Sequence, residues 1–367
     1  MLWAMDGAAI RAVLCRTPAL NAGHLQALVS AAEGELARTL DPQVIGRTDL
    51  PPAARAYLTS PDAAECRADL DWLAAAGGQS LLYTDSGYPP LLARIPCPPV
   101  ALFVLGDPAV LLTPQVAIVG SRNPTHGGCN TARELAGTLA RGGLTITSGL
   151  AVGIDAAGHE AALLAPGLTV AVLGTGLDRV YPRRHAHLAA RIREQGALVS
   201  EMPPRSRPTR WGFARRNRII SGLSLGTLVV EAALASGSLI TARCAARQGR
   251  RVLAVPGSIR SPLARGCHQL IRDGARLVES AAQVSSELNF SLSGEALALG
   301  LAPVGARREL DNEYEMLLDA LGFEPATVDS LAERTGRSCA SVAAMLLILE
   351  LEGRVAPQPG GTYGPLP

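Results

Sequence analysis

Short apolar runs that end in glycine turns recur through the middle of the chain. Runs of four to six residues, separated by helix-length segments, predict strands at residues 101–105, 116–119, 144–147, 169–173, 197–200, 227–230 and 251–255. Strands that alternate with helices at this spacing form an open, mostly parallel sheet with helices on both faces. We therefore expect a doubly wound α/β fold, in which a ligand lies beyond the carboxyl ends of the strands, where the glycine turns gather.

Helical patterns precede this region. Apolar residues at helical spacing predict helices at residues 8–14, 24–30 and 62–76, and prolines interrupt the pattern between them. Residues 1–80 are therefore expected to form a small helical, SAM-like domain, and residues 81–288 the α/β domain. Within the latter, the proline-rich residues 83–99 carry few periodic signals and suit a connection into the first strand.

A second helical region follows the predicted sheet. Residues 289–306 are small, apolar and weakly patterned, which is typical of a linker. A winged-helix-like domain is expected over residues 307–367, because three helical patterns are followed by a glycine-rich hairpin. Gly336 is expected to make the turn before the third helix, and Ser338 to cap it. The patterns cover residues 309–321, 328–335, 339–352 and, for the hairpin, 354–364.

The basic residues gather in the same region as the predicted strands. The chain has no lysine, and residues 116–279 hold 22 of its 34 arginines against 9 acids, a net charge of +13. Residues 1–114, 281–304 and 305–367 carry −4, −2 and −5, so the total of +2 hides a strongly basic centre. Such a local field attracts a polyanion, and guanidinium groups hold phosphate with two parallel hydrogen bonds. Nucleic acid or a nucleotide is the expected partner.

Three glycine turns that follow predicted strands are candidate phosphate sites. The first precedes a helix, so free backbone amides, a hydroxyl and a guanidinium converge there. Glycine also serves such turns in any α/β protein because it adopts positive φ, so a structural explanation stays open for each turn. The turns contain Gly120, Ser121 and Arg122; Gly149 and Gly153; and Gly174 and Gly176.

Two common nucleotide motifs are missing from the sequence. No predicted strand leads into Gly-x-Gly-x-x-Gly with an acid about 20 residues later, as a dinucleotide site requires. A P-loop needs a lysine, which the chain lacks. NAD and ATP are therefore disfavoured, and no cofactor is expected.

Arginines and aromatic residues are interleaved after the strand predicted at residues 197–200. An unpaired nucleic-acid strand suits such a surface, because its bases stack on rings while its backbone follows positive charge. The alternative is a solvated basic face with both rings in the core. The cluster contains Arg205, Arg207, Arg210, Trp211, Phe213, Arg215, Arg216, Asn217 and Arg218, and Tyr181 with Arg179, Arg183 and Arg184 extends it.

Several ordered motifs resemble the DprA/Smf family (DNA-processing protein A). They are VAIVGSR at 116–122, SGLAVGIDAAGHEAAL at 148–163, LGTGLDRVYP at 173–182, SEMPP at 200–204, RRNRIISGLS at 215–224, VVEAALASGSLITA at 229–242 and VPGSIRSPLARG at 255–266. The resemblance implies an extended Rossmann-like domain that binds and protects single-stranded DNA and helps to load RecA recombinase during natural transformation. It also implies a homodimer without catalysis, flanked by N-terminal helical and C-terminal winged-helix-like domains.

The resemblance also assigns residues. Ser121 and Arg122 correspond to a backbone-phosphate site, and Phe213 stands where members place an aromatic residue near the bases. The sequence departs from the family pattern at Gly158, at Ala214 and at His268 of Gly266-Cys267-His268, where the family has Gly-x-Asn. The expected DNA-binding set is Gly120, Ser121, Arg122, Gly149, Gly153, Gly174, Gly176, Arg183, Arg184, Phe213, Arg216, Asn217 and Arg218.

Three other functions were weighed. His159 and Glu160 could act as acid and base, but no nucleophile or metal partner accompanies them, so no catalytic residue is expected. A phosphoribohydrolase of the lysine-decarboxylase-like type would need an acid in the turn at residues 235–241, which has none. A sequence-specific regulator would need base-reading side chains at the start of the last helix, which is apolar, so the acidic tail is expected to bind protein or pack.

The compartment follows from the cysteines and the apolar runs. Seven cysteines are odd in number and scattered, which favours reduced thiols and no structural zinc, although Cys267 and His268 are adjacent. The first ten residues lack a signal-peptide pattern, and no apolar run approaches 18 residues. We expect a cytoplasmic protein without a membrane span or metal, and the DprA/Smf resemblance implies a homodimer through roughly residues 260–278.

Overall fold

The computed structural model describes residues 6–292, 312–322, 324–351 and 353–366. The chain divides into two compact units, one made of residues 1–124 and 128–297 and one made of residues 125–127 and 298–367. From residue 293 on, the linker predicted at residues 289–306 lies outside the described residues.

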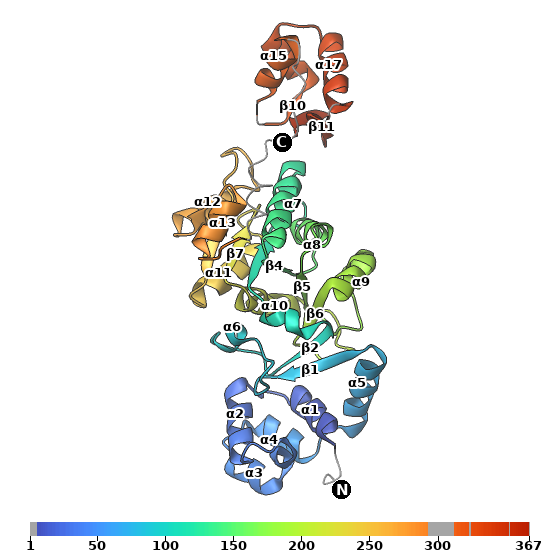
Figure 1. The fold of residues 1–367 in the computed structure, drawn as a ribbon, viewed down its shortest axis with the longest axis vertical. Coiled ribbons are helices and arrows are strands. Elements are labelled where there is room, and N and C mark those ends of the chain that lie inside the picture. The colour runs from blue at the N-terminus through green and yellow to red at the C-terminus, as the bar shows by residue number, and fades with distance from the viewer. Residues whose placement is uncertain (1–5, 293–311, 323, 352, 367) are drawn as a thin grey trace. The chain divides into compact units, whose positions relative to one another are not determined.

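A nine-stranded sheet forms the centre of the first unit (Figure 1). Its strands are β1 (Gly78–Leu82), β2 (Ala101–Gly106), β3 (Gln115–Val119), β4 (Thr145–Ser148), β5 (Thr169–Leu173), β6 (Gly196–Ser200), β7 (Gly226–Val229), β8 (Arg251–Ala254) and β9 (Arg276–Leu277). They lie in the order β1-β2-β6-β5-β4-β3-β7-β8-β9. Neighbours from β6 to β9 pair parallel, whereas β2 pairs antiparallel with β1 and β6. The predicted mostly parallel, doubly wound sheet is confirmed.

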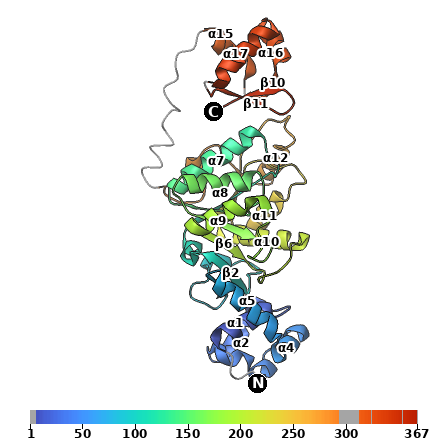
Figure 2. The same ribbon diagram turned by 90° about the vertical axis from the view of Figure 1, so that its right-hand side faces the viewer.

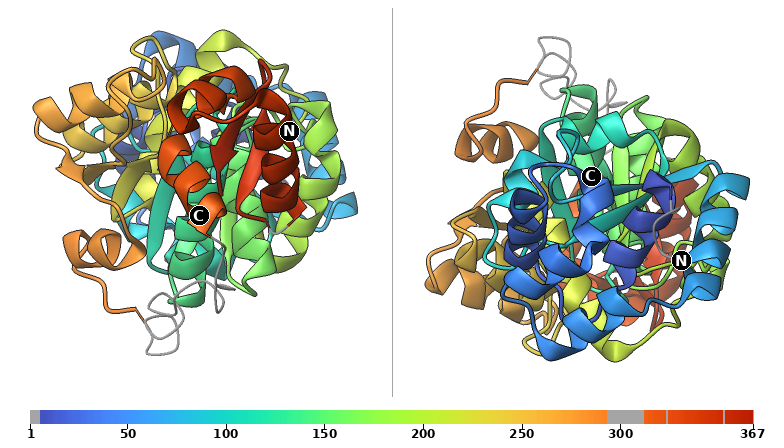
Figure 3. Two further views of the ribbon diagram at one scale, coloured as in Figure 1. Left: turned by 90° about the horizontal axis from the view of Figure 1, so that it is seen from above. Right: turned by 90° about the horizontal axis from the view of Figure 1, so that it is seen from below.

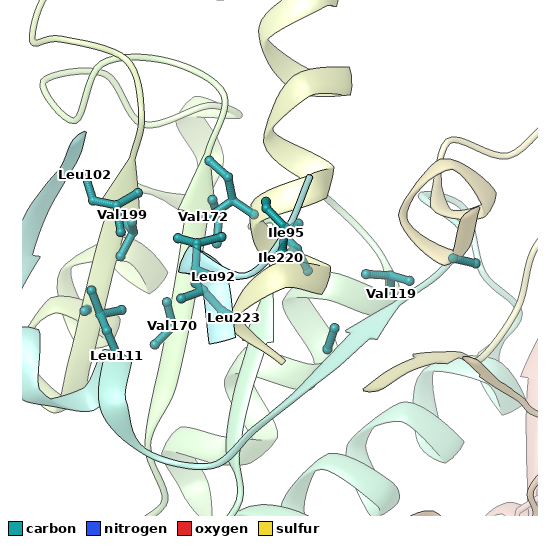
Figure 4. Close-up of a cluster of buried hydrophobic side chains, with 14 of the residues drawn as sticks. Leu92, Ile95, Leu102, Leu111, Val119, Val170, Val172, Val199, Ile220 and Leu223 are labelled. Carbon is teal, nitrogen blue, oxygen red and sulfur yellow. The ribbon is translucent and has the colours of Figure 1, made fainter. Parts of the chain in front are cut away.

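Helices cover both faces of this sheet (Figure 3). Those that connect β3 to β6 are α7 (His126–Arg141), α8 (Ile154–Leu164) and α9 (Ala186–Gln195); those that connect β6 to β9 are α10 (Arg210–Leu223), α11 (Ser238–Arg247) and α12 (Arg265–Arg272). Side chains alternate between the faces along each strand. Val116 and Ile118 face α7, α8 and α13 (Ala281–Glu287), while Ala117 and Val119 face α10 and α11. Ala117 and Val119 belong to the buried apolar cluster between the sheet and helices α10 and α11. Figure 4 shows this cluster, with Ile220 of α10 beside the strands.

The N-terminal helices have a core of their own. They are α1 (Gly7–Arg16), α2 (Ala22–Ala31), the 3₁₀ helix η2 (Leu36–Leu40), α3 (Pro42–Arg47), α4 (Pro52–Thr59) and α5 (Ala63–Ala75). Leu82 of β1 and Ala101 of β2 belong to this core, so the helices pack at the β1–β2 end of the sheet (Figure 2). The boundary expected at residue 80 therefore falls inside β1.

Several short elements of this unit were not predicted from the sequence, among them β1, β9, α6 (Pro90–Ala93) and η3 (Pro108–Leu112). Only the last two residues of β1 are buried, and both residues of β9 are exposed, so neither strand shows as an apolar run. The expected connection at residues 83–99 contains the one-turn helix α6. The short η3 helix leads into β3.

The second unit has the predicted winged-helix composition. Its elements are α15 (Asn312–Leu321), β10 (Ala326–Thr327), α16 (Val328–Thr335), α17 (Cys339–Leu351), β11 (Val355–Gln358) and β12 (Thr362–Pro365), with the strands in the order β10-β12-β11. Leu317, Leu331 and Leu346 form its core. Gly336 ends α16 with φ +67°, and the Ser338 hydroxyl accepts a hydrogen bond from the Ser341 amide at 3.2 Å, as expected.

A buried carboxylate ties the N-terminal helices to the loop before α10. Asp69 of α5 is 2% exposed and accepts hydrogen bonds from Arg16 Nε and from Arg205 Nη2, the latter at 3.1 Å. Arg205 has φ +67°, and its amide donates to Asp178 Oδ1 at 2.6 Å. The loop that leads into α10 is therefore held at this residue from two sides.

Asp69→Asn should lower the free energy of unfolding by about 2 kcal/mol, because the buried position loses charge-assisted hydrogen bonds to Arg16, which keeps Glu65 as a partner, and to the partly exposed Arg205. Urea unfolding followed by circular dichroism at pH 7 measures this change. Glu33→Gln breaks the exposed pair between Glu33 and Arg38 and is the control, which should leave the midpoint unchanged. Equal midpoints for the wild type and both variants would contradict a structural role for Asp69.

Candidate nucleic-acid interface

A cavity lies where the sheet changes winding direction, beyond the carboxyl ends of β3 and β7. We call it the first cavity; its volume is about 600 Å³. Its walls are the turn at residues 120–123, the first half of α10 and the loop and first turn of α11. Doubly wound sheets bind their ligands at this position.

Two further cavities adjoin the same rim. The second, of about 220 Å³, shares Arg122 and Phe213 with the first. The third, of about 760 Å³, shares Tyr181 with the second. The second is lined by Arg122, Gly149, Ala151, Val152, Tyr181, Pro182, Arg184, Phe213 and Arg216, and the third by Thr175, Asp178, Arg179, Val180, Tyr181, Arg183, Ala186 and Pro208.

The first glycine turn is closed by contacts with the chain. The Ser121 amide donates to the Glu231 carbonyl oxygen at 2.7 Å, and the Ser121 hydroxyl accepts from the Asn123 amide at 3.1 Å. A Cβ added at Gly120 would lie 2.9 Å from the same Glu231 oxygen. Arg122 is exposed, lines the first and second cavities, and has no ion pair among the described residues. Of this turn, the Arg122 side chain is the group best placed to reach a ligand.

The start of α7 is occupied by a carboxylate of the chain itself. A Cβ added at Gly128, in the first turn of α7, would lie 2.3 Å from Cδ of Glu231. A helix start attracts one anion most strongly, and here that anion is Glu231. The phosphate expected at this helix start would therefore have to displace Glu231.

The second turn encloses a buried guanidinium. Arg216 of α10 is 6% exposed, and its Nη1 donates to the Gly149 carbonyl oxygen at 2.6 Å and to that of Val172. A Cβ added at Gly149 would lie 2.1 Å from Nη1, so only glycine fits there. Gly153 has φ +84° and packs against the Ser121 carbonyl oxygen.

Asp155 balances the charge of Arg216. Its Oδ2 accepts hydrogen bonds from the Gly149 amide at 3.1 Å and the Ala151 amide at 3.4 Å. Burial raises the pKa of Asp155, while the Arg216 charge and these amides act to lower it. Burial lowers the pKa of Arg216 to about 10, so this residue stays charged at neutral pH. The pair joins α10 to the second turn.

The glycines of the third turn lie against α10 and the loop before it. A Cβ added at Gly174 would lie 2.8 Å from Cδ1 of Phe213, and one added at Gly176 would lie 2.5 Å from Oδ1 of Asp178. The Gly176 amide donates to the Ser206 carbonyl oxygen at 3.2 Å. In all three turns, close packing within the chain accounts for glycine.

The aromatic residues of the cluster differ in burial. Trp211 is 61% exposed, with the Arg215 guanidinium 4.7 Å from its ring centroid, so the alternative that places both rings in the core is wrong for Trp211. Phe213 is half-buried and borders the first and second cavities. Its ring centroid lies 5.2 Å from that of Tyr181, with the planes inclined by 43°.

The remaining predicted residues separate into two groups. Asn217 lines the first cavity, Arg184 the second and Arg183 the third; both arginines are exposed. Arg218 instead donates to Glu201 Oε1 at 2.5 Å, together with Arg215 at 2.7 Å, and lines none of the three cavities.

Sequence reasoning left some lining residues out of the site. Arg210, at the first position of α10, lines the first cavity and is exposed. The hydroxyl-bearing residues Ser236, Ser238 and Thr241, at the start of α11, line its opposite wall. The sequence signal for these residues is the Ser-Gly-Ser turn at residues 236–238, after β7.

Comparison with known proteins agrees with a DNA-related surface. Residues 79–289 match the model of DNA recombination-mediator protein A, and residues 302–361 match that of the DprA winged helix domain. The chain belongs to the DNA recombination-mediator protein A family. The DprA/Smf resemblance of its motifs is thereby confirmed.

Individual family members cover most of the chain. Protein Smf of Escherichia coli is 46% identical over 298 residues, which are 80% of this chain and 79% of the relative. DprA of Streptococcus pneumoniae is 45% identical over 206 residues, 56% of this chain and 73% of the relative. The X-ray structure of DprA from S. pneumoniae has a TM-score of 0.67 at 35% identity and covers 77% of this chain and 98% of that one.

A second solved structure concerns DNA processing protein A from Helicobacter pylori and a unique single-stranded DNA binding mode of that protein. Its TM-score is 0.53 at 28% identity, covering 58% of this chain and 95% of that one. The two solved structures therefore share the fold over 77% and 58% of this chain. Within the described part of the chain, every helix is too short or too polar to span a bilayer.

The family core also holds His159, the candidate acid or base. It is fully buried, with Nδ1 2.7 Å from the Thr169 hydroxyl. That hydroxyl donates to the Ile146 carbonyl oxygen at 2.6 Å, so His159 donates from Nδ1. Burial lowers the pKa of His159 to about 3, and the ring is therefore neutral and beyond reach of a ligand. Its position is that of a structural histidine.

Cys267 and His268 have separate partners. Cys267 is buried, with Sγ 3.6 Å from the carbonyl oxygens of Val229 and Val230, and burial raises its pKa to about 11. His268 Nε2 lies 3.0 Å from the Gly257 carbonyl oxygen. Among the described residues, no group of three His, Cys, Asp or Glu side chains is placed to hold a metal.

We predict that His159→Gln makes stability less dependent on pH. The folded pKa of His159, about 3, lies below the unfolded value of 6.5, so its contribution is fully present above pH 6.5 and is lost as the pH falls. Between pH 6.5 and 4.5 the wild type should lose about 2 kcal/mol through this residue. Urea unfolding of the wild type and of His159→Gln at several pH values measures this difference. Asp155 titrates in both proteins, so the difference between their pH profiles isolates His159. Parallel pH profiles would contradict the prediction.

Proposed function

We propose that the protein binds single-stranded DNA in the first cavity and along its rim, and does not transform it. The observation that carries this proposal is the half-buried Phe213 ring between two cavities, with exposed Arg122 and Arg210 at the first. Unpaired bases can stack on such a ring, whereas the bases of a duplex already stack on one another. The single-stranded DNA binding described for the H. pylori relative supports the same substrate.

The predicted residues are proposed to act in two ways. Arg122, Arg183 and Arg184 hold backbone phosphates, Phe213 stacks a base, and Asn217 hydrogen-bonds the strand. Arg216, Arg218 and Ser121 hold α10 and the first turn in place, because Arg216 donates to the Gly149 carbonyl oxygen, Arg218 to Glu201 and the Ser121 amide to the Glu231 carbonyl oxygen. The five predicted glycines, Gly120, Gly149, Gly153, Gly174 and Gly176, let these parts approach one another.

Binding without catalysis is favoured over the phosphoribohydrolase alternative. Asp155 is the one acid among the described residues that line the first cavity. Its side chain is buried and its Oδ2 already accepts hydrogen bonds from two backbone amides, so it is poorly placed to take a proton from a substrate. No other lining side chain of the described chain offers a carboxylate at this place.

We further propose that the protein protects the bound strand and passes it to RecA recombinase during recombination or natural transformation, in the cytoplasm. Membership of a recombination-mediator family supports this role. Phosphate contacts hold any sequence equally, which a mediator of recombination needs. The seven free cysteines suit a reducing compartment. The acidic winged-helix unit is proposed to bind protein or pack rather than hold DNA.

A homodimer through residues 260–278 is part of the proposal. These residues include β9, the edge strand of the sheet, where Leu277 is 48% exposed. An exposed edge strand offers free backbone groups to a second chain. Ile259, immediately before this segment, is 83% exposed and adds apolar surface.

Arg122→Ala should weaken single-strand binding without altering its sequence preference. Binding of oligothymidine and of a duplex should be measured by filter retention at several salt concentrations. The plot of log affinity against log salt should become shallower by about 0.7 for each lost phosphate contact. Arg133→Ala, an exposed arginine of α7 that lines none of the three cavities, is the control and should match the wild type. Equal wild-type affinity for duplex and single strand would defeat the stacking argument.

Light scattering at micromolar concentration should give twice the mass of one chain. Leu277→Asp places a charge on the β9 edge and should shift the protein to monomer. Leu164→Asp changes a leucine that is 76% exposed at the end of α8 and should leave the dimer intact. A wild type that is monomeric throughout would refute the proposed dimer.

A further inference from the structure

The three cavities follow one another along the rim: the first and second share Arg122, Ala151, Phe213 and Arg216, and the second and third share Tyr181. Phe213 borders the first and second cavities, and Tyr181 borders the second and third. Tyr181 follows β5, whereas Phe213 lies on α10, after β6. Two rings from different parts of the chain therefore stand at successive positions on one surface.

The distance between the two rings excludes one mode of stacking. A base inserted between them would need a centroid separation of about 7 Å, twice the roughly 3.5 Å contact distance of carbon atoms. The observed separation is 5.2 Å, with a tilt of 43°. Bases can therefore stack only on the outer sides of the pair, one beside Phe213 and one beside Tyr181. Tyr181 is 51% exposed and has surface available for this contact.

The third cavity has the charge that a nucleotide needs. Asp178 is engaged on both oxygens, by the Arg205 amide at 2.6 Å and by Arg179 Nε at 3.3 Å. Arg183 is exposed and has no ion pair among the described residues, so its charge is available for a phosphate. A volume of about 760 Å³ lies in the range of cavities that hold small ligands.

We propose that the third cavity is a further nucleotide subsite, in which Tyr181 stacks a base and Arg183 holds its phosphate. This inference rests on the proposed binding of single-stranded DNA, and it extends the bound strand from Phe213, past Arg184 in the second cavity, to Tyr181. Each ring then stacks on a different base of one strand, and the two rings do not hold a single base between them.

A length series of oligothymidine tests the subsite. Tyr181→Ala should leave the affinity for short oligomers unchanged and weaken that for longer ones by about fivefold to a hundredfold, the range found when a stacking aromatic is replaced by alanine. Tyr181→Phe should restore wild-type binding, because stacking needs only the ring. A general folding defect would instead weaken binding at every length.

Two further variants keep the test independent of the Tyr181 substitution. Arg183→Ala, which leaves both rings intact, should make the salt dependence shallower by about 0.7 for long oligomers only. Trp211→Ala is the matched control: Trp211 is 61% exposed but borders none of the three cavities, so its loss should change binding less than twofold at all lengths. If Tyr181→Ala binds oligomers of each length with the same affinity as the wild type, the subsite is disproved while the proposed function stands. If the wild type binds no single strand, the proposed function itself fails.

Discussion

The site depends on one buried charge, the guanidinium of Arg216. It donates to the carbonyl oxygens of Gly149 and Val172, and Asp155 supplies the opposite charge from the start of α8. A buried charge that lost these partners would cost several kcal/mol, so α10 cannot slide along the sheet without breaking the two hydrogen bonds of Arg216. Phe213 lies three residues before Arg216 on the same helix and therefore inherits this fixed position.

The strands were predictable because parallel strands buried on both faces are apolar throughout. Which side chains the glycines make room for could not be predicted from the sequence. Gly149 makes room for Arg216, and Gly174 for Phe213, and both partners come from α10, more than thirty residues later in the chain. A residue without a side chain gives the same sequence signal whether a ligand or another part of the chain fills the space. Only the fold distinguishes the two.

The arginines show the same limit of prediction from the sequence. Their number indicated an anionic partner, but the sequence could not show which of them are already neutralised. Asp69 forms an ion pair with Arg205, and Glu201 forms ion pairs with Arg215 and Arg218. In each pair the two partners are separated along the sequence. The arginines that line the cavities without an ion pair among the described residues are Arg122, Arg183, Arg184 and Arg210.

The carboxylate of Glu231 occupies the start of α7. The main candidates for phosphate contacts are therefore the arginines that line the cavities and have no ion pair among the described residues. A helix start is a fixed, directional anion site, and here the chain fills it with its own charge. The cations that remain are arginines on long side chains, which can follow a phosphate backbone, and contacts with phosphate carry no sequence information. Stacking on Phe213 accepts any base, because every base has a flat apolar face. A surface with these two kinds of contact holds an unpaired strand firmly and without regard to its sequence.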